Sequence, residues 1–127
     1  MQRFTDLKVW QRGHSLVLRV YRLTMALPDN EKYGLVSQLR RAAVSVPTNI
    51  AEGSKREGNQ DFVRFLNIAE GSLAESEYLI MLSRDLDYLT PTSVAPLLEE
   101  IKEVARMLHY LRMKVEPKAL RPSCKAA

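Results

Sequence analysis

Four basic residues near the start of the chain are the first candidates for chemistry. Lys8, Arg12, Arg19 and Arg22 recur at helical spacing, so a helix would place them along one side. A row of this kind can follow nucleic-acid phosphates, because Lys and Arg displace the counterions that phosphates carry. The simpler interpretation is a solvated helix face. The basic stripe (Lys8, Arg12, Arg19 and Arg22) is therefore a predicted nucleic-acid-binding surface with a plain alternative.

A second group of polar residues shares one helix face further along the chain, and it consists of Gln38, Arg41, Ser45, Asn49 and Glu52. This polar stripe has short amide and hydroxyl groups where an open helix surface commonly carries Lys and Glu. Such groups favour local bonds to the backbone or a polar contact with another helix. Three interpretations stay open: a solvated face, an oligomer interface, or a packed seam with Ser72, Glu75 or Ser76.

The patterns that usually mark catalysis or metal binding are missing from the sequence. The five glycines are scattered and form no phosphate-binding loop, and His14 and His109 do not belong to a paired metal-binding motif. The single cysteine, Cys124, excludes an internal disulfide. We predict no enzyme, no cofactor and no metal. A weaker alternative is an enzyme in which Arg41, Glu52 and Glu75 converge on a cleft.

Composition indicates one soluble domain that would lie in the cytoplasm. The chain has 127 residues, 46% hydrophobic and 27% charged, and its apolar runs are too short for a transmembrane helix or a secretory signal. The net charge of +4 is uneven, because residues 1–27 carry +4 while residues 59–90 carry −4. This segregation fits either a basic face for nucleic acid or pairing between opposite charges within or between subunits.

The elements that must position these groups are helices, since apolar residues recur at helical spacing throughout. We predict helices over about 5–26, 31–52, 59–86 and 92–115, the second kinked at Pro47 and the third capped by Asn59. Short connections favour an antiparallel up-down-up-down four-helix bundle over residues 1–116. Pro117 should end the fourth helix and leave residues 117–127 as a flexible basic tail.

The same spacing predicts which helix faces are buried. The fourth helix carries apolar residues at alternating steps of three and four from Leu97 to Val115, the pattern of a bundle seam. The predicted buried faces of the other helices are Leu7, Trp10, His14, Val17, Leu18, Tyr21 and Met25 on the first; Leu35, Leu39, Ala43, Val46 and Ile50 on the second; and Phe62, Phe65, Leu66, Ala69, Leu73, Leu79 and Ile80 on the third, with Ser72, Ser76 and Ser83 among them.

One long run gives the sequence a family resemblance. Residues 33–53, YGLVSQLRRAAVSVPTNIAEG, follow an opening Phe4-x-x-Leu7-x-Val9-Trp10 and precede Gly71-Ser72-Leu73 and Glu75. Over about residues 4–113 the chain resembles the bacterial four-helix-bundle family named for open reading frames in 23S ribosomal RNA intervening sequences. Asp87 departs from the family pattern, where glycine is common, although Asp tolerates a left-handed helix cap.

The resemblance implies a ring-like homopentamer whose biochemical role is not established. The genetic setting of the family suggests a link to ribosomal RNA or mobile elements. A distantly similar pentameric bundle, the accessory variability protein of diversity-generating retroelements, binds a reverse transcriptase and nucleic acid. We therefore expect a non-catalytic homo-oligomer that binds RNA or DNA, with a scaffold for a protein partner as the alternative.

Overall fold

The computed structural model describes the backbone of residues 3–124 and the side chains of residues 3–116, and within that range it is all-α. It contains four α-helices and no strand: α1 (Lys8–Thr24), α2 (Ser37–Ser54), α3 (Asn59–Asp85) and α4 (Pro91–Cys124). Three short elements accompany them, the 3-10 turns η1 (Phe4–Asp6) and η2 (Asp29–Glu31) and the π-helical turn η3 (Lys32–Val36). The all-α prediction is confirmed.

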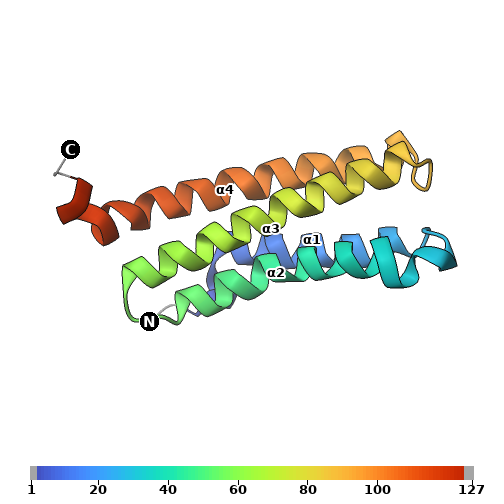
Figure 1. Ribbon diagram of the computed structural model, residues 1–127. Coiled ribbons are helices and arrows are strands. Elements are labelled where there is room, and N and C mark those ends of the chain that lie inside the picture. Colours follow the sequence, from blue (N-terminus) through green and yellow to red (C-terminus); the bar gives the residue numbers. More distant parts are fainter. Residues whose placement is uncertain (1–2, 125–127) are drawn as a thin grey trace.

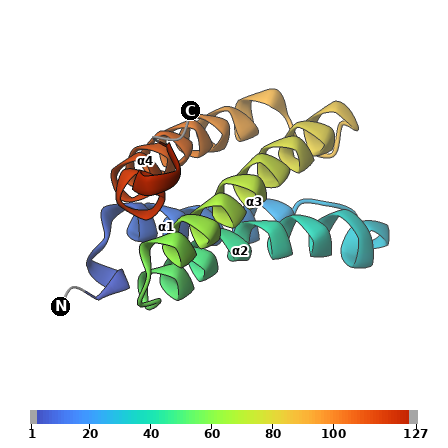
Figure 2. The same ribbon diagram turned by 60° about the vertical axis from the view of Figure 1, so that its left-hand side comes forward.

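Each helix packs against the next one along the chain, and the last helix also packs against the first. α2 contacts both α1 and α3, while α4 contacts both α3 and α1. In Figure 1 the colours run in opposite directions along successive helices, with α1 and α2 in one layer and α3 and α4 in the other. Figure 2 shows the α3–α4 pair crossing the α1–α2 pair at an angle. No helix in the described part has an apolar stretch long enough to span a membrane.

The core is built from the faces predicted for α2, α3 and α4. Leu39, Val46 and Ile50 of α2 are fully buried, as are Val104 and Leu108 of α4. Burying each such side chain stabilises the fold by about 1.5–3 kcal/mol relative to leaving it exposed. Among the α3 serines, Ser76 and Ser83 are buried, and each donates a hydrogen bond to a carbonyl one turn back.

Part of the predicted buried face of α1 is wrong, because three of its residues are exposed. The core side chains of this helix are Val9, Leu16, Val17 and Val20, whereas Leu18, Tyr21 and Met25 are exposed by 43, 41 and 79%. α1 carries two adjacent rows of apolar residues beside its basic stripe, so spacing alone allows two overlapping faces. Packing against α2 and α4 selects the face that contains Val9, Leu16 and Val20.

Two helix ends also differ from expectation. α4 continues past Pro117 to Cys124, so the predicted end at that proline is wrong. A proline inside a helix removes only one backbone hydrogen bond, so a helix can continue through it. α2 does the same at Pro47. Residues 125–127 and the side chains from 117 onward lie outside the described residues, so the flexible tail stays a prediction. α2 proper begins at Ser37, later than expected, because η2 and η3 form the preceding residues.

Both ends of α3 are set by backbone conformation. The N-cap residue is Gly58 and not Asn59 as predicted, so no side chain caps this end of the helix. At the other end Asp87 has φ of 64°, the left-handed conformation expected for a residue that replaces a capping glycine. The backbone N–H groups of Tyr88 and Leu89 then both donate to the Ser83 carbonyl, which closes the helix before α4 begins.

Candidate nucleic-acid interface

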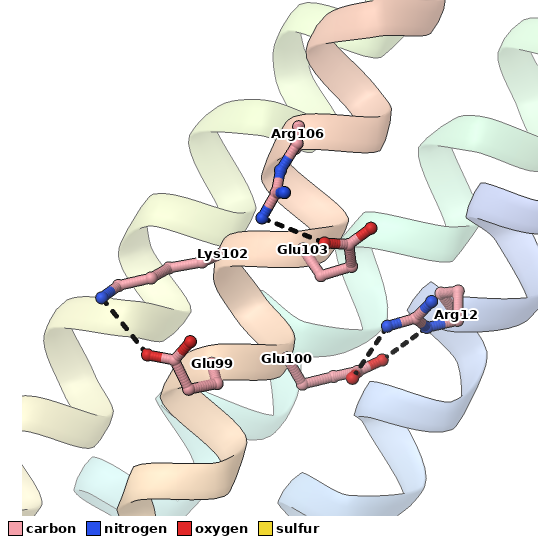
Figure 3. Close-up of polar contacts among 6 residues, drawn as sticks. All are labelled: Arg12, Glu99, Glu100, Lys102, Glu103 and Arg106. Atoms are coloured by element: carbon pink, nitrogen blue, oxygen red, sulfur yellow. Dashed lines mark hydrogen bonds and ion pairs between the residues drawn. The ribbon is translucent and has the colours of Figure 1, made fainter.

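The basic stripe on α1 is partly neutralised by α4. Arg12 Nε and Nη2 donate to the two carboxylate oxygens of Glu100 at 2.7 and 3.0 Å, a bidentate ion pair drawn in Figure 3. This hydrogen bonding raises the pKa of Arg12 and lowers the pKa of Glu100, with burial opposing both shifts. Arg12 therefore fixes α1 to α4 and is not a free phosphate contact.

The other members of the stripe keep their charge available. Lys8 and Arg22 are exposed and Arg19 is half-buried, and none of these three forms an ion pair with another described side chain. Arg19 lies near enough to Glu100 to help lower the pKa of that carboxyl. The stripe thus offers three cations without ion pairs, and its fourth member, Arg12, is paired with Glu100.

The polar stripe on α2 forms part of a seam with α3. Ser45 Oγ and Ser72 Oγ share a hydrogen bond of 2.7 Å, and Gln38 Nε2 donates to Glu75 at 3.5 Å. Asn49 Nδ2 donates back to the Ser45 carbonyl at 2.8 Å and to its hydroxyl at 2.9 Å. Ser45, Asn49 and Ser72 are half-buried, so these members follow the packed-seam alternative.

The remaining stripe residues point to separate places. Arg41 donates to Ser37 Oγ at 3.1 Å, while Glu52 lines a cavity of about 390 Å³ with Trp10 and His14. The side chains of Arg41, Glu52 and Glu75 thus have different partners, and the structure does not bring them together around one cleft. The arrangement gives no support to the alternative in which these three residues act as an enzyme site. No group of three or more metal-ligating side chains occurs among the described residues.

Two interactions, Arg112–Glu70 and Tyr88–Glu31, were not found from the sequence because each joins residues distant along the chain. Arg112 of α4 binds Glu70 of α3 and also Glu116, and the bond to Glu70 is the largest cause of the raised pKa of Arg112. Glu31 accepts hydrogen bonds from the Leu35 backbone N–H at 3.1 Å and from the Tyr88 hydroxyl at 3.0 Å. No periodicity within a single helix signals such pairs.

Charge is divided between the two helical pairs. Residues 3–58 hold ten Lys and Arg against five Asp and Glu, a net of +5, whereas residues 59–116 hold six against ten, a net of −4. Of the ion pairs between described side chains, only Arg12–Glu100 reaches α1 or α2, and the others lie within α3 and α4. Figure 3 shows two of the latter, Glu99–Lys102 and Glu103–Arg106. The cations of the α3–α4 pair are therefore mostly matched, and those of the α1–α2 pair are mostly free.

Comparison with known proteins identifies the class of this all-helical chain. The sequence model of the 23S rRNA-intervening sequence protein family matches residues 5–110, and the chain belongs to that family. A solved structure of a protein of unknown function from the S23 ribosomal protein family of Bacteroides thetaiotaomicron is similar, with a TM-score of 0.74. It is 21% identical over 82% of this chain and 97% of that chain, which shows a shared fold. A comparison with curated proteins gives no match.

Proposed function

We propose that this chain is an antiparallel up-down-up-down four-helix bundle that binds nucleic acid as a non-catalytic, homo-oligomeric accessory protein in the cytoplasm. The observation that carries the proposal is the surplus of unmatched cations on the α1–α2 pair. Cations without carboxylate partners are free to replace phosphate counterions, which is the main source of affinity for nucleic acids. Membership of a family named for ribosomal RNA intervening sequences supports RNA as a ligand.

Self-association is supported by the outer face of α1. This face carries three large apolar side chains that are exposed in the single chain: Leu18, Tyr21 and Met25. Exposed apolar rows of this kind commonly mark a contact with another protein surface. We propose a second copy as the occupant and a homopentamer as the assembly, which would repeat the cationic surface five times and raise avidity for a long polyanion.

Fluorescence anisotropy with labelled RNA and duplex DNA, at roughly 50 and 200 mM salt, tests nucleic-acid binding. Several phosphate contacts should weaken binding by about tenfold or more across this range. The triple variant Lys8→Gln, Arg19→Gln, Arg22→Gln should bind more weakly and with a smaller salt slope. No binding at the lower salt would refute the proposed function.

A matched variant controls for loss of net charge. Arg64→Gln, Lys102→Gln and Arg106→Gln together also remove three positive charges, but from exposed ion pairs of the α3–α4 pair. Binding should change less in this control than in the α1 variant. Equal losses in both would indicate that net charge alone governs binding, with no preferred surface.

A protein-interaction scaffold is the second candidate, favoured by the same exposed row on α1. Light scattering after size-exclusion chromatography separates the two uses of that row. A pentamer would assign it to self-association, whereas a monomer would leave it for a different protein. In the second case pull-down from the native host should recover one specific partner, and Met25→Glu should abolish its capture.

A further inference from the structure

A groove at one end of the α1–α2 pair combines aromatic and cationic side chains. It has a volume of about 480 Å³ and lies between the C-terminal turns of α1, the π-helical turn η3 and the first turns of α2. Among the described side chains, no acidic residue lines it. Its lining includes Tyr21, Lys32, Tyr33, Ser37, Arg40 and Arg41, and Tyr21, which belongs to the outer face of α1, is covered by the Arg40 guanidinium.

Tyr33 is the most exposed of the large hydrophobic side chains in this groove, with 89% of its surface open to solvent. It nevertheless sits on a well-anchored turn, because Glu31, the N-cap residue of η3, accepts hydrogen bonds from the Leu35 N–H within the turn and from the hydroxyl of Tyr88, which follows α3. π-helical turns occur frequently at functional sites. The structure therefore presents a solvated aromatic ring on a fixed piece of backbone.

The three cations that line the groove with Tyr33 are Lys32, Arg40 and Arg41, and none has a carboxylate partner among the described side chains. Arg40 is oriented by bonds from Nε to Thr24 Oγ1 at 2.9 Å and from Nη2 to the Tyr21 carbonyl at 3.1 Å, with its guanidinium over the Tyr21 ring. Arg41 is exposed and bonds only Ser37 Oγ. A guanidinium has five N–H donors, so both arginines keep donors for an anion.

We propose that this groove binds a nucleotide of single-stranded nucleic acid, with a base stacked on Tyr33 and phosphates facing Lys32 and Arg41. The inference rests on the proposed function and gives it a site. Aromatic stacking beside a cationic path is the usual basis of single-strand binding. A duplex keeps its bases stacked on one another, so Tyr33 would gain no base contact from it.

Anisotropy with a labelled single-stranded RNA, and with the same RNA annealed to its complement, tests the site. Tyr33→Leu should weaken single-strand binding between about fivefold and one-hundredfold, the range for loss of one stacked base. Tyr33→Phe should retain binding because it keeps the ring. Arg41→Gln should lower the salt slope by about 0.7, the value for one lost single-strand phosphate contact.

Tyr78→Leu is the matched control, because Tyr78 is a 59% exposed tyrosine on the acidic α3. It should leave binding unchanged, and duplex binding should be insensitive to Tyr33→Leu. Binding of the single strand that survives Tyr33→Leu and Arg41→Gln would overturn this site while leaving nucleic-acid binding intact. Failure of the unmodified protein to bind any RNA would overturn both proposals.

Two further outcomes would also overturn the site. Light scattering is measured on each variant, and a change of assembly state in Tyr33→Leu would assign Tyr33 to a subunit contact. Polyglutamate that competes as well as RNA would show a surface for acidic protein segments. The proposal requires an unchanged assembly and preference for the single strand.

Discussion

The crossing of α2 over α3 depends on Gly53, and Gly53→Ala should destabilise the protein. Gly53 is buried, and a Cβ atom there would lie 2.7 Å from Phe65 Cβ and 3.0 Å from Phe62 Cδ1. The closer contact is to an atom attached to the α3 backbone, so side-chain rotation cannot relieve it. Overpacking of this kind costs about 1–3 kcal/mol.

The intrinsic helix preference of alanine offsets part of that cost, by up to about 1 kcal/mol. With the full offset, we therefore expect the free energy of unfolding to fall by up to about 2 kcal/mol and Tm to fall by up to about 8 °C. Gly71→Ala is the control within α3, because a Cβ there meets nothing within 4 Å. It should raise stability by about 0.5–1 kcal/mol.

Urea and thermal unfolding followed by circular dichroism at 222 nm measure both variants. Protein concentration must be held constant, because the proposed assembly would stabilise the folded state by mass action. If Gly53→Ala is as stable as the unmodified protein, α2 and α3 do not approach as closely as the structure shows. If Gly71→Ala is the more destabilised of the two, the steric reasoning is refuted.

Three other substitutions probe separate contacts, each by urea unfolding. Glu100→Gln should cost about 0.5–1 kcal/mol, since Arg12 is 41% exposed and solvent screens the pair, and a double-mutant cycle with Arg12→Gln should recover that coupling. Because the pKa of Glu100 is lowered in the folded state, this stability is present at neutral pH and is lost as the pH falls through the folded-state pKa. Glu100→Gln should therefore reduce the loss of unfolding free energy at acidic pH. An unchanged dependence of stability on acidic pH would contradict this. Leu39→Ala, at a fully buried site, should cost about 2–5 kcal/mol, and a loss below 1 kcal/mol would contradict its place in the core. Ser45→Ala should cost about 1–3 kcal/mol, because the substitution removes the hydrogen bonds that the hydroxyl group makes with Ser72 and with Asn49 Nδ2 in a half-buried seam; a larger loss would indicate a wider polar network.

The number of α-helices, most of their bounds and three of the four buried faces followed from apolar spacing, but the start of α2 and the end of α4 did not. Leu39, Val46 and Ile50 of α2 occupy the core as the spacing predicts. α1 has two neighbouring rows of apolar residues, and its spacing is compatible with burial of Tyr21 or of Val20. Tertiary packing resolves this choice, and it is not encoded in the periodicity of one helix.

The candidate site was less predictable for a related reason. The basic stripe was correctly placed on one helix, but the capture of Arg12 by Glu100 joins residues 88 positions apart. The groove around Tyr33 depends on a π-helical turn that replaces the first turn expected of α2. Local propensity did not signal that turn, whose anchor Glu31 is tied to Tyr88 beyond α3.

The division of charge between the two helical pairs has a kinetic consequence. A subunit with +5 over residues 3–58 and −4 over residues 59–116 has a large electric dipole moment. A polyanion exerts a torque on such a dipole from about one Debye length away, roughly 10 Å at 0.1 M ionic strength. In the proposed nucleic-acid binding, the chain would therefore turn its α1–α2 pair toward the polyanion before first contact. Orientation during diffusion, rather than trial and error after collision, would then set the rate of productive encounter.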